Sequence, residues 1–202
     1  MKTTLNKIRE HEPCADGWQK LLAYLGKTKA DDEPLEITTI LDSNGIDDAL
    51  WCLRAVEGYD RELRLYAVWC ARQVQHLLKD QRSLDALDVA ERYANGQATE
   101  AELKDAAEAA MAAAVMTAYA AENARFTVCN GAKDAAWGAC YAAWAACSAA
   151  ETAYYAAKAA RSAREAAWSA AWGACYASEA ADTRHEMKQR QEAELRRICG
   201  EG

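Results

Sequence analysis

Both prolines of this 202-residue chain, Pro13 and Pro34, lie within its first 34 residues. Proline removes a backbone donor and clashes with the preceding helical turn, so its absence from residues 35–202 leaves long helices sterically allowed there. Alanine, the residue with the highest helix propensity, fills close to half of residues 101–181. The sequence therefore predicts an all-α protein, a multi-helix bundle of antiparallel helices with long alanine-rich C-terminal helices.

Capping and periodicity signals predict where the helices lie. Residues 1–45 are expected to be the least regular part, with one short helix that Gly26 ends. Asp60 is expected to cap one helix, and Thr99 with Glu102 forms a capping box for another. The predicted helices run over about 16–25, 46–58, 61–78, 83–94 and 99–128, with further helix from 134 to about 197 and a bend at 158–165.

The net charge of −7 belongs to the first half of the chain. Residues 1–110 hold 21 acidic and 14 basic side chains, whereas residues 111–202 hold ten of each. We predict an acidic helical region over 1–97 and an alanine-rich helical hairpin or bundle over 98–202, packed together as one globular unit. The acidic balance argues against direct nucleic-acid binding, because proteins that bind the phosphate backbone carry positive charge.

An acidic surface favours a basic protein partner, although it is also what keeps many proteins in solution. Several carboxylates of the first half lie at expected turns and helix starts, where Asp47 and Asp48 are also favoured by the helix dipole. The candidate partner-binding residues are Asp42, Asp47, Asp48, Glu57 and Asp60.

One octapeptide, Ala-Ala-Trp-Gly-Ala-Cys-Tyr-Ala, occurs at 135–142 and again at 170–177. The offset of 35 residues equals five heptads, so the aromatic residues of both copies fall along one helical seam. A bundle core is the first interpretation, and a self-association seam or a pocket that stacks a planar or phosphorylated ligand are the alternatives. The candidate pocket residues are Trp137, Tyr141, Trp144, Arg161, Arg164, Trp168, Trp172 and Tyr176.

The eight cysteines include no CxxC pair, and the three histidines are scattered, so we expect neither a metal site nor a cofactor. No apolar signal segment follows Met1, which favours a reducing cytoplasm where cysteines act as small buried hydrophobes. No run of about 18 uncharged apolar residues predicts a membrane span. The nucleophile-elbow, HExxH, P-loop and dinucleotide patterns are also missing, so we expect no catalytic residues.

Three stretches, 48–56, 64–74 and 86–96, read DALWCLRAV, RLYAVWCARQV and ALDVAERYANG. Followed by an alanine-rich helix, this order resembles the Imm-5-like immunity protein family and uncharacterised proteins common in phages and prophages. The resemblance covers about residues 46–160. It implies an all-α protein that acts by binding, in conflict between microbes or between phage and host.

The leading hypothesis is therefore a non-enzymatic inhibitor, of immunity or anti-defence type, that binds a toxin or a defence component. One alternative is a sponge that sequesters a nucleotide-like signal between tryptophan and tyrosine rings. The other is a structural homo-oligomer built through the aromatic seam.

Overall fold

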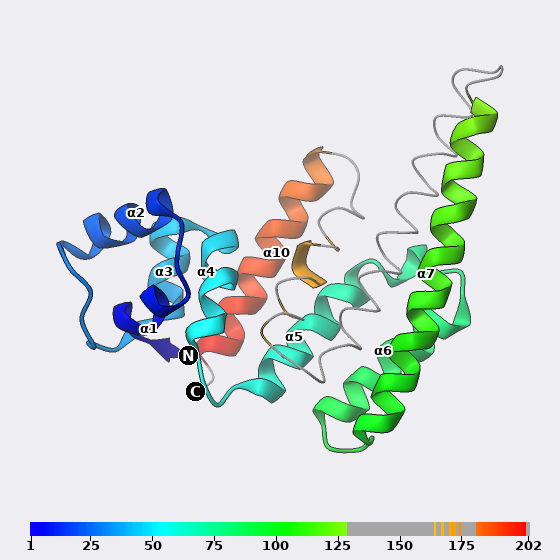
Figure 1. The fold of residues 1–202 in the computed structure, drawn as a ribbon, viewed down its shortest axis with the longest axis horizontal. Coiled ribbons are helices and arrows are strands. Elements are labelled where there is room, and N and C mark those ends of the chain that lie inside the picture. Colours follow the sequence, from blue (N-terminus) through cyan, green and yellow to red (C-terminus); the bar gives the residue numbers. More distant parts are fainter. Residues whose placement is uncertain (129–163, 165–166, 168–169, 173, 175–180, 201–202) are drawn as a thin grey trace.

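The computed structural model of the chain describes residues 1–128, 164, 167, 170–172, 174 and 181–200 (Figure 1). Apart from one short pairing of two strands, the regular structure of these residues is helical, which confirms the predicted all-α class. No helix among them is both long enough and apolar enough to cross a membrane.

Residues 1–56, named here the N-terminal lobe, contain several short elements. These are β1 (Lys2–Thr3), α1 (Leu5–Glu10), α2 (Ala15–Leu25), β2 (Leu35–Glu36), α3 (Ile37–Asn44), α4 (Ile46–Cys52) and the 3₁₀-helix η1 (Leu53–Ala55). The elements that follow are α5 (Asp60–Gln73), the 3₁₀-helix η2 (Gln75–Leu77), α6 (Gln81–Ala94), α7 (Glu100–Val128) and α10 (Ala181–Gly200).

The expectation of a single short helix in residues 1–45 is wrong, because this region also contains α1, α3 and the antiparallel pair of β1 and β2. Helix α3 begins with four β-branched residues, Ile37-Thr38-Thr39-Ile40, whose stiff side chains lower helix propensity. Ile37, Ile40 and Leu41 are nevertheless buried. Tertiary burial of this apolar face therefore outweighs the local preference, as it does for most helices in proteins.

Glycine and capping signals located other boundaries correctly. Gly26, with φ of 65°, is the left-handed C-cap of α2. The backbone N–H of Thr99 donates to Oε2 of Glu102 at 2.7 Å, and the N–H of Glu102 donates to Oγ1 of Thr99 at 3.2 Å. This is the predicted capping box, and the helix that it opens, α7, is described over Glu100–Val128.

Three helix predictions need correction. The helix expected over 46–58 divides into α4 and η1, which ends at Ala55. The helix expected over 61–78 likewise divides into α5, which ends at Gln73, and η2. Asp60 is the first residue of α5 and not its cap, because Tyr59 occupies the cap position without a side-chain hydrogen bond to the helix. The carboxylate of Asp60 still lies in the first turn, where the helix dipole favours it.

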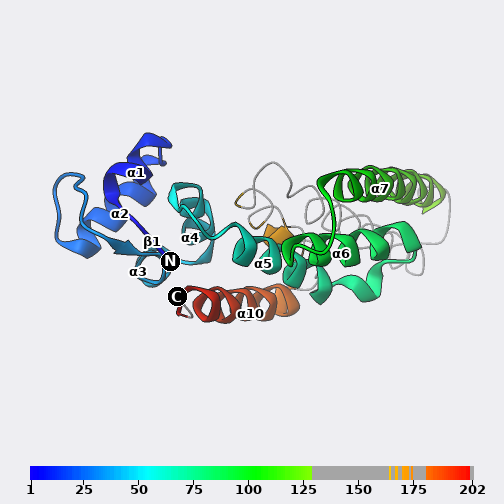
Figure 2. The ribbon, with the colours of Figure 1, turned by 90° about the horizontal axis from the view of Figure 1, so that it is seen from below.

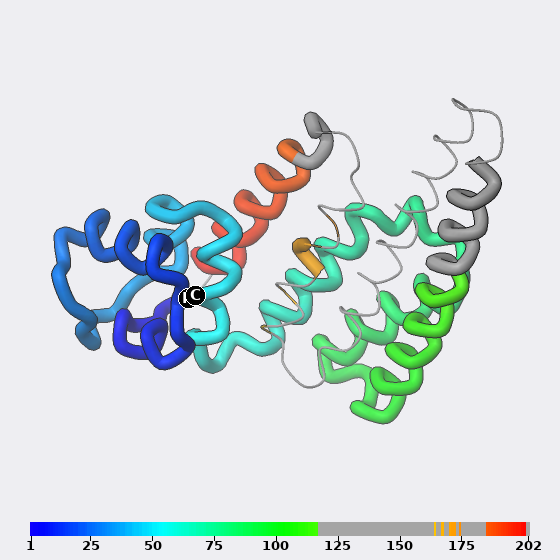
Figure 3. The backbone as a smooth tube through the Cα atoms, turned by 45° about the horizontal axis from the view of Figure 1, so that its top comes forward, coloured from blue at the N-terminus to red at the C-terminus, as the bar shows by residue number. Residues whose placement is uncertain are grey.

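Helix α10 joins the two halves of the chain, since it packs against α3, α4 and α5 (Figures 1 and 2). Helix α7 packs along α6, and this hairpin lies at the opposite end of the molecule from α1 and α2 (Figure 3). Both sets of contacts cross the predicted division at 97/98. The backbone nitrogen of Met1 also donates to the carbonyl of Cys199 at 3.1 Å.

Much of the duplicated aromatic segment lies outside the described residues. This applies to the whole first octapeptide at 135–142. Of the second copy the structure describes 170–172 and 174, which are helical, and of the predicted bend at 158–165 it describes residue 164 alone.

Candidate functional site

A pocket of about 230 Å³ lies between the N-terminal lobe and the segment around residue 172. Three tryptophans from different parts of the chain line it: Trp18 of α2, Trp51 of α4 and Trp172. Ile8, Leu21 and Ile40 complete much of the apolar wall. Since Cys14 and Asp47 also line the pocket and are exposed, it opens to solvent on their side.

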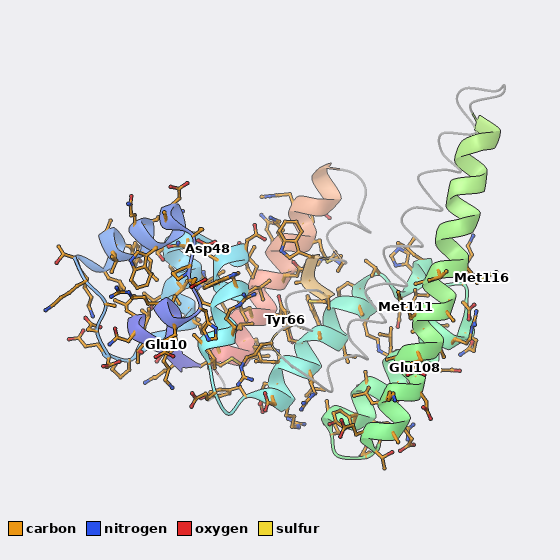
Figure 4. All side chains as sticks on the ribbon, viewed as in Figure 1. Glu10, Asp48, Tyr66, Glu108, Met111 and Met116 are labelled. Carbon is orange, nitrogen blue, oxygen red and sulfur yellow. The ribbon has the colours of Figure 1, made fainter. Side chains whose placement is uncertain are left out.

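Gly17 lets α2 approach α4 closely enough to form this pocket. A Cβ atom at position 17 would lie 2.8 Å from Oδ2 of Asp48, closer than side-chain carbons pack, and 3.1 Å from Sγ of Cys14, which is tighter than most such contacts. The Asp48 carboxylate thus lies on the side of α4 that faces α2 (Figure 4). Glycine at this helical position leaves space for that carboxylate, which any larger residue would displace.

Asn44, at the end of α3, holds the two helices together. Its Nδ2 atom donates both to the carbonyl of Gly17 at 2.8 Å and to Oδ2 of Asp48 at 2.7 Å. The Oδ1 atom of Asn44 accepts a hydrogen bond from the hydroxyl of Ser43 at 2.7 Å. These three bonds fix the orientation of the amide, and the amide in turn fixes the carboxylate of Asp48.

A chain of buried hydrogen bonds positions the segment that carries Trp172. Nε2 of the buried Gln191, on α10, donates to the carbonyl of Ala171 at 2.8 Å. The hydroxyl of Tyr66, labelled in Figure 4, donates to the carbonyl of Gln191 at 3.4 Å. Helices α5 and α10 therefore hold residue 171, and with it the neighbouring Trp172, against the lobe.

Two cations lie on tryptophan rings of the pocket without being part of its lining. The guanidinium of Arg54 lies 4.5 Å from the ring centroid of Trp51, and Nζ of Lys188 lies 5.9 Å from that of Trp172. Lys188 also pairs with Asp47 at 2.8 Å, which joins α10 to α4 beside the pocket. Each of these two rings thus already makes a cation–π contact with a residue that does not line the pocket.

The pocket contains two cysteines in contrasting environments. Cys14 is exposed, whereas Cys52 is buried, as are Cys70 and Cys199. Burial, together with the nearby Asp48 carboxylate, raises the pKa of the Cys52 thiol to about 12. Because the thiolate is the reactive form, Cys52 is an unreactive apolar part of the wall at neutral pH.

The candidate partner-binding carboxylates do not gather at one site, and four of them pair with basic side chains of the same chain. Asp42 pairs with Arg196 at 2.6 Å, and Asp47 with Lys188 at 2.8 Å. The other two pairs are Glu57 with Lys7 at 3.1 Å and Asp60 with Arg164 at 3.2 Å. Asp48 is the fifth, held by Asn44 in the pocket. Their role toward a protein partner stays a prediction.

Of the candidate pocket residues from the aromatic repeat, the structure describes Arg164 and Trp172. It separates them, because Trp172 lines the pocket while Arg164 donates to the carbonyl of Val56 and pairs with Asp60. The remaining candidates lie outside the described residues: Trp137, Tyr141, Trp144, Arg161, Trp168 and Tyr176.

Sequence reasoning missed Trp18 and Trp51, which are 33 residues apart and lie on two short helices. The one local signal is Gly17, directly before Trp18. A glycine inside a helix indicates close approach of a neighbouring group, here the carboxylate of Asp48.

Among the described residues, no three His, Cys, Asp or Glu side chains lie close enough together to hold a metal ion. Comparison of the chain with protein-family models, with curated proteins and with solved structures finds no match.

Proposed function

We propose that this chain is a non-enzymatic binding protein that sequesters a small organic molecule in the tryptophan pocket of its N-terminal lobe. One observation carries the proposal: Trp18, Trp51 and Trp172, from three separate segments, converge on a single pocket of about 230 Å³ that opens to solvent. Apolar, aromatic pockets with a few oriented polar groups are the usual sites of small-molecule binding. The fixed amide of Asn44 and carboxylate of Asp48 are such polar groups.

The wall of the pocket favours a ligand other than a phosphorylated one. Its charged lining residues, within the described part of the chain, are Asp47 and Asp48, and no Lys or Arg is among them. Phosphate recognition relies on Arg, Lys or backbone N–H groups that neutralise the anion. We therefore do not assign the binding of a nucleotide-like signal, which the aromatic repeat suggests, to this pocket. For the rest of the chain it stays a prediction.

A basic protein partner on the acidic first half has less support. Asp42, Asp47 and Asp60 are paired with cations of the second half, namely Arg196, Lys188 and Arg164. Each pair lowers the net negative charge that these carboxylates would present to a partner. The small-molecule function is consequently the one that the geometry favours.

Binding of a neutral probe tests the proposal. We expect 2-phenylethanol to change the tryptophan fluorescence of the full chain in a saturable way, because its phenyl ring enters between the pocket's indoles. A Cys14→Phe substitution places a ring at the exposed side of the pocket and is expected to weaken binding at least about tenfold. Calorimetric titration gives the same comparison without relying on fluorescence.

Ala23→Phe is the matched control, since Ala23 is exposed on α2, the helix whose N-cap residue is Cys14, and does not line the pocket. This variant is expected to bind the probe as the parent chain does. Equal binding by the Cys14→Phe chain would contradict the proposed function, and so would the absence of a saturable signal both from this neutral probe and from amine and carboxylate probes of similar size.

A further inference from the structure

The charges of the pocket wall give the ligand a chemical class, an inference that rests on the proposed function. Asp47 and Asp48 are both carboxylates, but their surroundings differ. Asp47 is paired with Nζ of Lys188 at 2.8 Å and is exposed. The charge of Asp47 is therefore offset by Lys188 of the same chain, which leaves Asp48 as the carboxylate that can act on a ligand.

Asp48 is oriented without being neutralised. Its Oδ2 atom accepts a hydrogen bond from the amide of Asn44 at 2.7 Å, a neutral donor. Within the described part of the chain its Oδ1 atom accepts no hydrogen bond, and the carboxylate forms no ion pair. Gly17 leaves the space that the carboxylate occupies. Asn44 and Gly17 thus position the partly buried carboxylate of Asp48, whose Oδ1 atom can still accept a hydrogen bond from a ligand.

Two cations lie beside the pocket without lining it: Arg54 lies on a face of Trp51, and Lys188 lies near the ring of Trp172 and pairs with Asp47. The thiol of Cys52, on the wall of the pocket, lies close enough to Asp48 and to Arg54 for both charges to act on its pKa. Its pKa is raised first by burial and next by Asp48, while Arg54 lowers it less than Asp48 raises it. Asp48 and Arg54 thus act on this thiol in opposite directions, and the carboxylate of Asp48 has the larger effect of the two.

We infer that the pocket selects a small organic cation, a primary ammonium joined by a short alkyl chain to an aromatic ring of phenyl or indole size, with Asp48 as its counter-ion and the three tryptophans around its ring. A protonated amine donates to the spare Oδ1 acceptor of Asp48 in a charge-assisted hydrogen bond. Tryptophan faces attract the same ammonium and stack with its ring. An apolar surround strengthens the ion pair relative to water.

Three probes of nearly equal size test the charge preference: 2-phenylethylamine, which is protonated at neutral pH, neutral 2-phenylethanol and anionic 3-phenylpropanoate. Each is titrated into the full chain with tryptophan fluorescence and calorimetry as readouts. The amine is expected to bind at least about fivefold more tightly than the alcohol, and the carboxylate most weakly. Asp48→Asn keeps the shape of the side chain and is expected to reduce the amine's advantage to about twofold or less.

Two further variants check that Asp48 itself is responsible. Asp42→Asn removes a carboxylate that pairs with Arg196 outside the pocket, and it is expected to leave the amine preference unchanged. Gly17→Ala places a methyl group 2.8 Å from the present position of Oδ2, so it displaces the carboxylate and is expected to reduce the preference without removing the charge.

The outcomes separate this inference from the proposed function. If the alcohol binds as tightly as the amine, or if Asp48→Asn leaves the preference intact, the inference is overturned while the pocket remains a binding site. If none of the three probes binds, both are overturned.

Discussion

The N-terminal lobe and the hairpin of α6 and α7 bury their surfaces in different ways. In the lobe, short helices meet through large side chains, and Leu5, Ile8, Ile37, Ile40 and Leu53 are almost fully buried. In the hairpin, a second cluster is made mainly of alanines: Ala86, Ala90, Ala107 and Ala110 pack around Leu103 and Val68. Within the described residues, the lobe supplies most of the lining of the tryptophan pocket, and the hairpin supplies none of it.

Side-chain size accounts for this contrast. Alanines let two long helices approach closely along their length, which leaves little room for a ligand between them. Large side chains on short helices that cross at several orientations fill the centre of the lobe but leave a concave region at its edge. A binding site is therefore expected where the chain departs from its alanine-rich pattern.

The largest predicted effect is the loss of a large side chain in the lobe. Leu53→Ala removes a fully buried side chain and leaves a cavity, so the free energy of unfolding is expected to fall by about 2–5 kcal/mol. Urea denaturation measures the change. Leu22→Ala, at a half-buried position of α2, is expected to cost less, and equal losses would show that the degree of burial does not decide the cost of losing a leucine in the lobe.

Overpacking is the corresponding test for the hairpin. Ala110 of α7 is fully buried in the cluster that this helix forms with α6. Ala110→Leu is therefore expected to lower the free energy of unfolding by about 1–3 kcal/mol. The same change at the exposed Ala112, two residues further along α7, is the control and is expected to be nearly neutral. If both variants are equally stable, the hairpin is less closely packed than its alanines indicate.

The smallest effect concerns pH and the pocket wall. The ordinary pKa of a thiol is 9.0, and that of Cys52 is raised to about 12, so the folded state keeps a proton that the unfolded state releases. This contribution to stability is complete below about pH 9 and is lost as the pH rises toward about 12. Between about pH 8 and pH 10 the parent chain is expected to lose about 1.4 kcal/mol more than Cys52→Ala does.

Urea denaturation at the two pH values, on both chains, gives this difference. The thiol of Cys199, whose pKa is also raised by burial, is present in both chains and cancels from the comparison. Parallel pH dependence of the two chains would mean that Cys52 is not the buried thiol described here.

The sequence predicted the helical class and those boundaries that have a chemical signal. Gly26 ends α2, and Thr99 with Glu102 opens α7, because caps satisfy backbone groups that any helix end leaves without partners. It did not predict α3, whose β-branched start argues against a helix until the burial of Ile37 and Ile40 is known. Nor did it predict Trp18 and Trp51 as neighbours, since no periodicity links two short helices.

The amino-acid sequence by itself therefore determined the all-α class, the long α7 and the acidity of the first half. The tertiary structure alone decided that Asp42 pairs with Arg196 and Asp47 with Lys188, across 154 and 141 positions of sequence. It likewise decided that Trp172 joins Trp18 and Trp51 in one pocket. Helix propensity and capping act over a few residues and can be recognised locally, whereas ion pairs and pockets depend on which distant surfaces the burial of apolar side chains brings together.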